Sequence, residues 1–270
     1  MTINTEVSAH QYVSDLFGVA GKVVVVTGGG RGIGEMIAEG FVHAGARVYI
    51  ASRDAGILAQ TAERLSEFGE CIAIPADLSS VEGVHALAAE IASREQHIHV
   101  LVNNAGTAWG SPIDTYSADG FDRVLNVNLK GVFVLTQQLL PLLRAGASTS
   151  DPARIINIGS VNGLTAPRAG TNNWAYSASK AGVHMLTQHL ALDMAAEHIT
   201  VNAVAPGPFE TKMMAHVFND PDRSDALKKR VPLHRSGEPD DAAGATIFLA
   251  SRAGSYLTGV ILPVSGGIEL

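Results

Sequence analysis

Two side chains in the second half of the sequence are spaced for proton transfer. Tyr176 and Lys180 lie four residues apart in a segment, 175–197, that is predicted to be helical, so both lie on one face. A phenol has a pKa of about 10, and a neighbouring ammonium favours the phenolate, which makes the group a usable general acid or base. Ser160 follows a predicted strand, 154–158, and its hydroxyl can hydrogen-bond an oxygen that gains negative charge beside Tyr176.

Each of these residues also has an ordinary structural interpretation. A tyrosine and a lysine four residues apart usually form a surface pair, and a serine after a strand usually closes a turn or caps a helix. The catalytic hypothesis therefore depends on what else the chain places beside them.

A glycine-rich turn near the start of the chain predicts a site for a pyrophosphate. Residues 27–34 read Thr-Gly-Gly-Gly-Arg-Gly-Ile-Gly and lie between a predicted strand, 22–27, and a predicted helix, 33–43. Glycines let the backbone approach a phosphate closely, and the helix N-terminus offers free N–H groups with partial positive charge. We assign to this site the residues Gly28, Gly30, Arg31, Gly32, Ile33 and Gly34.

The end of the second predicted strand, 47–52, distinguishes between two dinucleotides. An NAD site places an acid there to bind the ribose 2′-hydroxyl, whereas this chain has Ser52 and Arg53. A serine can donate to a phosphate, an arginine can pair with one as a fork, and Arg31 adds a second cation. We therefore predict NADP(H), while Asp54 keeps NAD possible.

Two residues after the third predicted strand, 70–76, are placed to border the adenine ring. They are Asp77 and Leu78. Asp77 has a second interpretation as the N-cap of the helix that follows.

The elements that must position these residues alternate along the chain. Near-continuous Val/Ile strands separated by helices indicate right-handed βαβ units and a parallel sheet. We predict the α/β class, as a single doubly wound Rossmann domain with about seven parallel strands, in preference to a barrel of eight βα units. The remaining strands are predicted at 100–103, 200–205 and 260–264, and the remaining helices at 58–68, 80–94, 118–142 (one helix or two, stopped near Pro141) and 239–250.

Length, charge and composition limit the remaining alternatives. The 270 residues fit an N-terminal extension at 1–20 and a catalytic domain at 21–270, with a substrate loop at about 208–238. The net charge of −7, from 19 basic and 26 acidic residues, argues against a nucleic-acid surface. The single cysteine, Cys71, the lack of a long apolar run and the lack of a basic leader favour a cytoplasmic protein with no membrane partner.

Ten histidines are present, but their spacing does not indicate a catalytic metal. His97 and His99 lie in a polar loop without nearby carboxylates, and His184 and His189 are five residues apart, which is not one helix face. We therefore expect no metal.

Several short motifs together resemble the short-chain dehydrogenase/reductase family. They occur in the family's order and spacing across residues 20–270. Within the family the chain is most similar to the 3-oxoacyl reductases, including the rhamnolipid-pathway type, through 74–80, 103–107 and 155–160. The motifs are the glycine turn, Asn103-Asn104-Ala105-Gly106, Asn126-Val127-Asn128, Ser160, Tyr176-Ser177-Ala178-Ser179-Lys180 and Pro206-Gly207.

The resemblance implies roles for residues whose types alone do not reveal them. Lys180 would bind the nicotinamide ribose, and Asn128 would hold a water that links Lys180 to solvent. The turn at Pro206 and Gly207 would cover the nicotinamide, and Thr211 would contact its carboxamide. The residues expected to border the adenine ribose are Asn104, Ala105 and Gly106.

The resemblance also implies an activity and an assembly. We expect an oxidoreductase that transfers a hydride from NADPH to a ketone, such as a 3-oxoacyl thioester or a similar apolar carbonyl, and so makes a secondary alcohol. Such a carbonyl reductase would be a homotetramer built through 118–142, 175–197 and the C-terminal segment. An acyl-carrier protein is a weaker possibility as a partner, through the basic run Lys228-Lys229-Arg230.

Three alternative functions remain open. The first is an NAD-dependent alcohol, sugar or steroid dehydrogenase. The second is a non-catalytic protein that senses NADP(H), which the complete set of Asn128, Ser160, Tyr176 and Lys180 argues against. The third is epimerisation or dehydration on the same scaffold.

The segment between Ser160 and Tyr176 is longer than the family commonly has, with fifteen intervening residues. We expect 161–175 to shape the substrate pocket, with Trp174 in its wall. Met213 and Met214 could line an apolar lid, where methionine gives adaptable contacts, or could be ordinary core residues.

Overall fold

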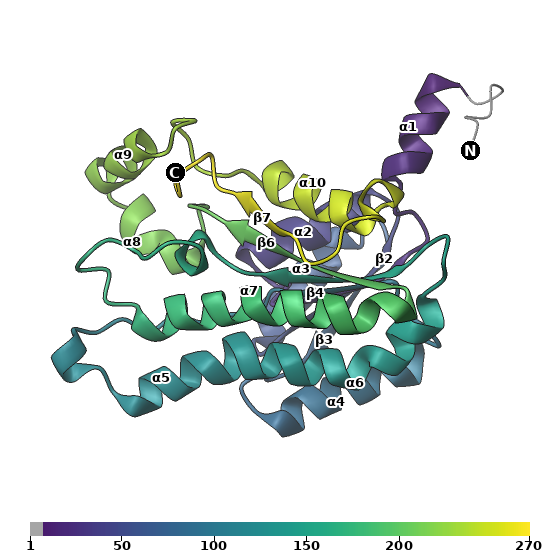
Figure 1. Ribbon diagram of the computed structural model, residues 1–270, viewed down its shortest axis with the longest axis horizontal. Helices are drawn as coiled ribbons and strands as arrows, with labels where there is room; N and C mark the ends of the chain where they lie inside the picture. Colours follow the sequence, from purple (N-terminus) through teal and green to yellow (C-terminus); the bar gives the residue numbers. More distant parts are fainter. Residues whose placement is uncertain (1–7) are drawn as a thin grey trace.

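The Val- and Ile-rich strands form one parallel sheet. In the computed structural model, which describes residues 8–270, the strand order is β3-β2-β1-β4-β5-β6-β7 (Figure 1). All neighbouring strands are parallel, which confirms the doubly wound fold class and excludes the barrel. The strands are β1 (Val23–Thr27), β2 (Arg47–Ser52), β3 (Cys71–Pro75), β4 (Val100–Asn103), β5 (Ala153–Ile158), β6 (Ile199–Pro206) and β7 (Ile261–Val264).

Helices cover both faces of this sheet. Figure 1 shows α2 and α10 above the sheet and α4, α6 and α7 below it. Side chains alternate along β1, so that Val24 and Val26 join one hydrophobic cluster and Val25 joins the other. The helices are α1 (Ala9–Phe17), α2 (Gly32–His43), α3 (Ala55–Leu65), α4 (Val81–Arg94), α5 (Ala118–Leu125), α6 (Gly131–Gly146), α7 (Trp174–Met194), α8 (Ala215–Phe218), α9 (Pro221–Arg230) and α10 (Pro239–Ala250).

Helices α2 and α10, which share one face of the sheet, are in close contact. A Cβ on Gly40 of α2 would lie only 2.4 Å from the Cβ of Ala243 on α10. Glycine at this position therefore lets the two helices pack at short range. Phe41 of α2 and Leu249 of α10 are fully buried in the same cluster.

The segment 118–142 forms two helices, which is one of its two predicted alternatives, but its end differs from the prediction. It is divided into α5 and α6 by a π-helical turn, Asn126–Lys130, and α6 continues through Pro141 to Gly146. The prediction that Pro141 stops the helix is therefore wrong. A proline leaves the carbonyl four residues earlier without its helical partner, and both Pro141 and Gln137 are exposed, so water can bind that carbonyl.

Other boundaries differ because of helix caps. α3 begins three residues before the predicted start, since the Asp54 side chain accepts a hydrogen bond from the N–H of Ile57 at 3.1 Å. Asp77 is not the N-cap of α4, because Ser80 holds that position.

The segment 208–238, expected as a loop, contains α8 and α9.

The N-terminal extension 1–20 contains the unpredicted helix α1, whose Phe17 ring lies 6.4 Å from that of Phe248. Residues 1–7 lie outside the described residues. None of the helices within 8–270 is both long and apolar enough to cross a membrane.

A chain of buried polar side chains joins the central strands to two helices. Asn103 on β4 donates from Nδ2 to Oδ1 of Asn157 on β5 (2.9 Å) and to Thr136 of α6 (3.1 Å). Asn157 in turn donates to Thr187 of α7 at 2.9 Å. All four side chains are at most 2% exposed, so each depends on the others for its hydrogen bonds.

Asn157→Leu should therefore destabilise the protein. The substitution keeps a similar volume but removes the partners of Asn103 and Thr187, and we expect the free energy of unfolding to fall by about 1–3 kcal/mol. Urea denaturation measures this change. Gln138→Leu on the exposed face of α6 is the control, and equal stability of the two variants would contradict the argument.

Candidate active site

The candidate site lies where the carboxyl ends of four central strands meet. The glycine turn follows β1, residues 104–107 follow β4, Ser160 follows β5 and Gly207 follows β6. The sheet order changes direction between β1 and β4. In open parallel sheets a crevice forms at this position, and ligands bind there.

The glycine turn is packed tightly against the segment that follows β4. Gly28 has a positive φ of 67°, and a Cβ on it would lie 2.8 Å from Nδ2 of Asn104. A Cβ on Gly34 would lie 2.3 Å from the carbonyl oxygen of Gly28. Thr27 holds the two segments together, because its Oγ1 accepts hydrogen bonds from the backbone N–H groups of Asn104 and Ala105, both at 3.0 Å.

The first turn of α2 is open to an anion. Arg31 is the N-cap of this helix but makes no side-chain capping hydrogen bond. By contrast, Asp54 caps α3 and Ser80 caps α4. The unpaired N–H groups and the helix dipole of α2 therefore fit a phosphate group.

The residues at the end of β2 fit a second phosphate. Ser52 adjoins the glycine turn, since a Cβ on Gly30 would lie 3.3 Å from its Oγ. Arg31 and Arg53 are exposed and form no ion pair within residues 8–270. The Asp54 carboxylate is engaged in capping α3, so the acid that could bind a ribose 2′-hydroxyl has another partner. These features fit the 2′-phosphate of NADP.

Asp77 and Leu78 lie beside this cationic group. Hydrogen bonds from the backbone N–H of Ser79 are the largest cause that lowers the pKa of Asp77, and the positive charge of Arg53 lowers it further. The N–H of Ala76 donates to the carbonyl of Ser52 at 2.9 Å, so Arg53 and Asp77 follow neighbouring strand ends, and the adenine role of Asp77 stays a prediction. Leu78 is buried, with 8% of its surface exposed.

Tyr176 and Lys180 lie on one face of the first turns of α7. The Nζ of Lys180 is 5.7 Å from the centre of the Tyr176 ring and donates a hydrogen bond to the carbonyl of Ile158 at 2.7 Å. A Cβ on Gly106 would lie 3.7 Å from this Nζ and 3.6 Å from Oδ1 of Asn128. The structure therefore brings these predicted residues together.

The charge states of the pair differ from the sequence expectation. Burial raises the pKa of Tyr176, and hydrogen bonding to Ser160 lowers it by a smaller amount. Burial also lowers the pKa of Lys180 to about 8. In the chain by itself, burial thus outweighs the expected effect of the ammonium on the phenol, and Tyr176 keeps its proton.

Asn128 lies in the π-helical turn, and its side chain makes three hydrogen bonds. Its Oδ1 accepts from the N–H of Thr107 (2.8 Å), and its Nδ2 donates to the carbonyl of Thr107 and to Oγ of Ser179, both at 3.0 Å. Ser179 also donates to the carbonyl of Tyr176 at 2.7 Å. Sequence reasoning missed Thr107 and Ser179 as supports, because a small polar residue in a motif carries no signal of its partner.

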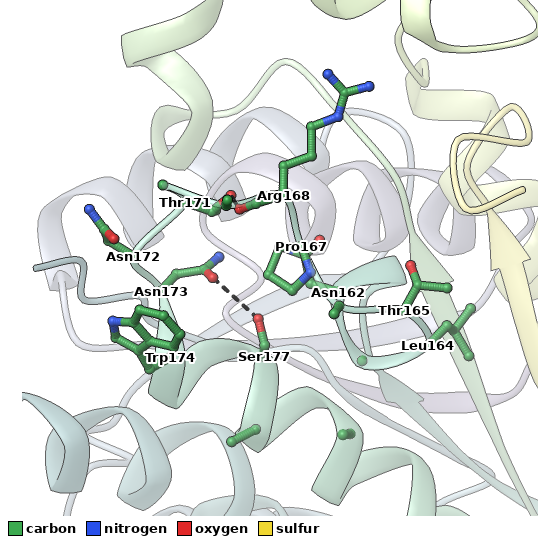
Figure 2. A pocket seen from close by; sticks show the side chains of 16 residues that line it. Asn162, Leu164, Thr165, Pro167, Arg168, Thr171, Asn172, Asn173, Trp174 and Ser177 are labelled. Atoms are coloured by element: carbon green, nitrogen blue, oxygen red, sulfur yellow. Dashed lines mark hydrogen bonds between the residues drawn. The ribbon is translucent and has the colours of Figure 1, made fainter. Parts of the chain in front are cut away.

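The enlarged loop forms a cavity of its own. Residues 162–174 and three residues of α7 (Ser177, Ala178 and Ala181) line a partly open cavity of about 460 Å³, and neither Ser160 nor Tyr176 lines this space. Figure 2 shows Trp174, Asn173 and Ser177 around it. The ring nitrogen of Trp174 donates to the carbonyl of Ser111 at 3.2 Å, so the geometry does not place Trp174 with the catalytic candidates.

The segment after β6 reaches back to the glycine turn. A Cβ on Gly32 would lie 3.3 Å from the methyl group of Thr211. Met213 and Met214 follow in a 3-10 helix, and Met213 is 45% exposed. The structure therefore places Thr211 against the glycine turn, with the two methionines close behind it in the chain, and its contact with a carboxamide stays a prediction.

The histidines do not form a metal centre in the part of the chain that is described. Within residues 8–270, no three His, Cys, Asp or Glu side chains lie together as metal ligands. The rings of His97 and His99 contact each other edge to face, with centroids 4.9 Å apart. His184 is buried against Gly159 and Gly163.

Comparisons with known proteins agree with this geometry. A family model described as enoyl-(acyl carrier protein) reductase matches residues 28–269. The chain is 48% identical to a rhamnolipids biosynthesis 3-oxoacyl-[acyl-carrier-protein] reductase of Pseudomonas aeruginosa, over 94% of this chain and 98% of that one. It is 37% identical to a 2-dehydro-3-deoxy-D-gluconate 5-dehydrogenase of Bacillus subtilis, over 95% and 98%.

A solved structure is similar over almost the same length. It is a Pseudomonas aeruginosa RhlG/NADP active-site complex, with a TM-score of 0.92 and 47% identity. The match covers 95% of this chain and 99% of that chain.

The buried charge of Lys180 should affect stability in a pH-dependent way. Its pKa is lowered from 10.5 to about 8 in the fold, so the cost of the buried ammonium is complete below pH 8 and fades as the pH rises toward 10.5. We expect Lys180→Met to be more stable than the parent at pH 7, by up to about 3 kcal/mol. Its advantage should shrink at higher pH.

Urea denaturation of both proteins between pH 7 and pH 10 tests this. The methionine lacks the hydrogen bond to Ile158, so the variant should become the less stable protein at the alkaline end. A stability difference independent of pH would mean that the Lys180 ammonium is solvated in the fold.

Proposed function

Because the chain belongs to the short-chain dehydrogenase/reductase family, we propose that it reduces a 3-oxoacyl thioester, or a similar apolar ketone, to a secondary alcohol. It is an NADP-dependent oxidoreductase. The observation that carries the proposal is that Ser160, Tyr176 and Lys180 meet beside an open phosphate-binding turn, in a chain 48% identical to a 3-oxoacyl reductase.

The cofactor site is built from the strand ends described above. The open first turn of α2 would bind the pyrophosphate, and Ser52, Arg31 and Arg53 would bind the 2′-phosphate. NADPH, when bound, supplies a hydride for the carbonyl carbon. The full set assigned to this site is Gly28, Gly30, Arg31, Gly32, Ile33, Gly34, Ser52, Arg53, Asp77, Leu78, Asn104, Ala105, Gly106, Tyr176, Lys180, Pro206, Gly207 and Thr211.

In this mechanism Tyr176 donates its phenolic proton to the carbonyl oxygen of the substrate. Burial raises the pKa of this phenol, so the proton is in place at neutral pH. Ser160 donates a hydrogen bond to the same oxygen and stabilises its negative charge. Only 6% of the Ser160 surface is exposed, which strengthens that interaction.

Lys180 and Asn128 restore the proton in the same mechanism. The Nζ of Lys180 binds the nicotinamide ribose hydroxyls and carries a proton toward Tyr176. A pKa of about 8 lets this amine both lose and regain a proton near neutral pH. Asn128 holds the 104–107 segment through Thr107 and positions the water that links Lys180 to solvent.

The substrate is held by residues from two segments. Ser160 and Tyr176 bind the carbonyl, and Met213 and Met214 of the segment 208–238 cover an apolar chain. Trp174, predicted for the substrate wall, instead lines the separate cavity of the enlarged loop. Residues 21–270 thus act as one catalytic domain.

A sugar dehydrogenase is the second candidate function. The similarity to the Bacillus 2-dehydro-3-deoxy-D-gluconate 5-dehydrogenase favours it. The apolar side chains of Met213 and Met214 support the first candidate, because a polyol would need more polar contacts. A pure NADP(H) sensor would have no use for Tyr176.

The proposal extends to assembly and location. Apolar side chains on α6 and α7 are exposed, among them Phe133 (44%), Met185 (59%) and Leu192 (79%), and they support a homotetramer built on these helices and the C-terminal segment.

The net charge of −7 does not suit a nucleic-acid partner. The single cysteine, Cys71, is buried and free, which suits a cytoplasmic protein.

Arg53→Ala should separate the two cofactors. Loss of a charge-assisted bond to the 2′-phosphate should raise the KM for NADPH by about 10- to 100-fold and leave the KM for NADH within about twofold. Initial rates with each cofactor measure this. Arg64→Ala on α3 is the control, because Arg64 pairs with Glu35 and Glu39. Equal effects on both cofactors would place Arg53 outside the phosphate site.

Tyr176→Phe tests the chemistry itself. Removal of the proton donor should lower kcat by about 10²- to 10⁴-fold, while NADPH binding, followed by its fluorescence, stays unchanged. The substrates for the assay are a 3-oxoacyl thioester with NADPH, and 2-dehydro-3-deoxy-D-gluconate with the oxidised cofactors NADP⁺ and NAD⁺. Turnover of the sugar acid but not the thioester would replace the first candidate by the second, and full activity of the variant would contradict the mechanism.

A further inference from the structure

One buried side chain beside the Ser160 segment takes no part in the proposed proton transfer. His184 lies one helical turn after Lys180 on α7, and only 7% of its surface is exposed. Within residues 8–270, neither of its ring nitrogens has a hydrogen-bond partner. A buried polar atom without a partner costs free energy, which an apolar side chain of similar size would avoid. The imidazole therefore contributes its shape at this position.

The ring is uncharged as well as unpaired. Burial is the largest cause that lowers the pKa of His184, and the positive charge of Lys180 lowers it further. The backbone of Gly163 is close enough to raise this pKa by a smaller amount, but it is not in hydrogen-bond geometry with the ring. At neutral pH the side chain is therefore a flat, neutral ring inside the fold.

Two glycines on either side of Ser160 lie against this ring. A Cβ on Gly159 would lie 2.1 Å from Nε2 of His184 and 2.6 Å from its Cδ2. A Cβ on Gly163 would lie 2.9 Å from Cε1 of the same ring and would also meet the backbone of α7. The flat ring and the two glycines thus form one close contact between α7 and the segment that carries Ser160.

Hydrogen bonds connect this contact to the Ser160 hydroxyl. Ser160 is the N-cap of a 3-10 turn, and its Oγ accepts from the N–H of Asn162 at 3.1 Å. Its carbonyl accepts from the N–H of Gly163 at 2.9 Å. Gly159 directly precedes the serine. The ring of His184 therefore lies against the residue before Ser160 and against the turn to which its Oγ is bonded.

The position of this hydroxyl determines how well it can serve in the reaction. A donor stabilises the developing charge only when it lies at hydrogen-bond distance from the oxygen that gains the charge. A displacement of about 1 Å can lower the rate by about 10²-fold. A side chain that fixes the backbone around Ser160 can therefore control the rate without donating a proton or a hydrogen bond itself.

We propose that His184 is a positioning residue, whose ring holds Gly159 and Gly163 so that the Ser160 hydroxyl is directed at the carbonyl oxygen of the substrate. This inference rests on the proposed function, because the proposed function gives Ser160 its role. The effect of the ring passes through Ser160. Removal of the Ser160 hydroxyl should therefore remove the effect of His184 as well.

A double-mutant cycle tests whether His184 acts through Ser160. His184→Leu should lower kcat for the 3-oxoacyl thioester by about 10-fold or more and leave the KM for NADPH within about twofold. In a Ser160→Ala protein, the same leucine substitution should change kcat by less than about twofold. His85→Leu on the exposed face of α4 is the control and should leave both values unchanged.

Two results of this cycle would overturn the inference. An equal fall in kcat in both backgrounds would mean that the ring supports the fold or another group, and not Ser160. An unchanged kcat in His184→Leu would mean that the ring has no part in the reaction. Urea denaturation of each variant checks that lost activity is not lost folding, and the midpoint should not fall, because leucine replaces an unpaired polar ring.

An exchange of volume between the ring and a glycine tests the contact with a second set of variants. Alanine is compatible with the backbone at position 159, where φ is not positive, but the three atoms nearest its methyl group would all belong to His184. Gly159→Ala should therefore lower kcat by about 10-fold or more. Gly159→Ala combined with His184→Ala should have a higher kcat than Gly159→Ala alone, and no recovery would contradict the contact.

Amide hydrogen exchange keeps this inference separate from the proposed function, since it needs no turnover. His184→Leu should speed exchange at the N–H groups of Asn162 and Gly163, which are bonded to Ser160, by about 10-fold or more, and leave exchange in β4 unchanged. This result would support the positioning role even if no 3-oxoacyl compound is reduced, in which case only the proposed function fails. Unchanged exchange at both groups would overturn the positioning role.

Discussion

The close approach between the glycine turn and the segment after β4 is the constraint on which the site depends. At this position the sheet order changes direction, and the two chain segments must form the floor of the crevice without side chains between them. Gly28 and Gly34 leave no space for a Cβ, and Thr27 ties the turn to Asn104 through its hydroxyl. The phosphate site at α2 and the residues around Gly106 therefore keep a fixed separation, which a dinucleotide can bridge.

Burial then sets the protonation of the groups at the other end of the crevice. Lys180 lies under the strand ends with a single described hydrogen bond, to Ile158, and it carries its charge there at a cost in stability. Tyr176, which is near it, keeps its proton for the same reason. Folding energy from the two apolar clusters on either side of the sheet offsets this cost. The site thus holds a proton donor and a weakly basic amine close together.

The sequence predicts the sheet well because buried parallel strands have a strong signal. The boundaries of β2 and β4 agree with prediction to the residue, since each is a short Val/Ile run with turn residues at its ends. The prediction that the helix stops at Pro141 is wrong because a proline is tolerated where the freed carbonyl is exposed, and hydrophobic periodicity does not reveal this exposure. The predicted start of α3 is three residues late because the capping role of the Asp54 side chain is not evident from the sequence, where Asp54 can equally be a ribose ligand.

The candidate site was predictable only where backbone geometry limits residue type. Glycines at a close approach, and a tyrosine and a lysine on one helix face, follow from local spacing. Thr107 and Ser179 support Asn128, which is distant from both in the sequence. Trp174 is predicted in the substrate wall because it belongs to the enlarged loop 161–175, but that loop lines a cavity of its own, and Trp174 lies there.

The packing of α2 against α10 has a consequence for how the chain reaches this fold. The partner of an early helix lies about two hundred residues later, and the approach at Gly40 and Ala243 cannot form before both are present. Likewise, the edge of β1 that pairs with β4 stays unpaired until β4 has been synthesised. During synthesis, Ile37 and Phe41 on the apolar face of α2 therefore lack the contact with α10 until almost the whole chain has left the ribosome. Nascent chains that stall before this point expose hydrophobic surface, which chaperones bind.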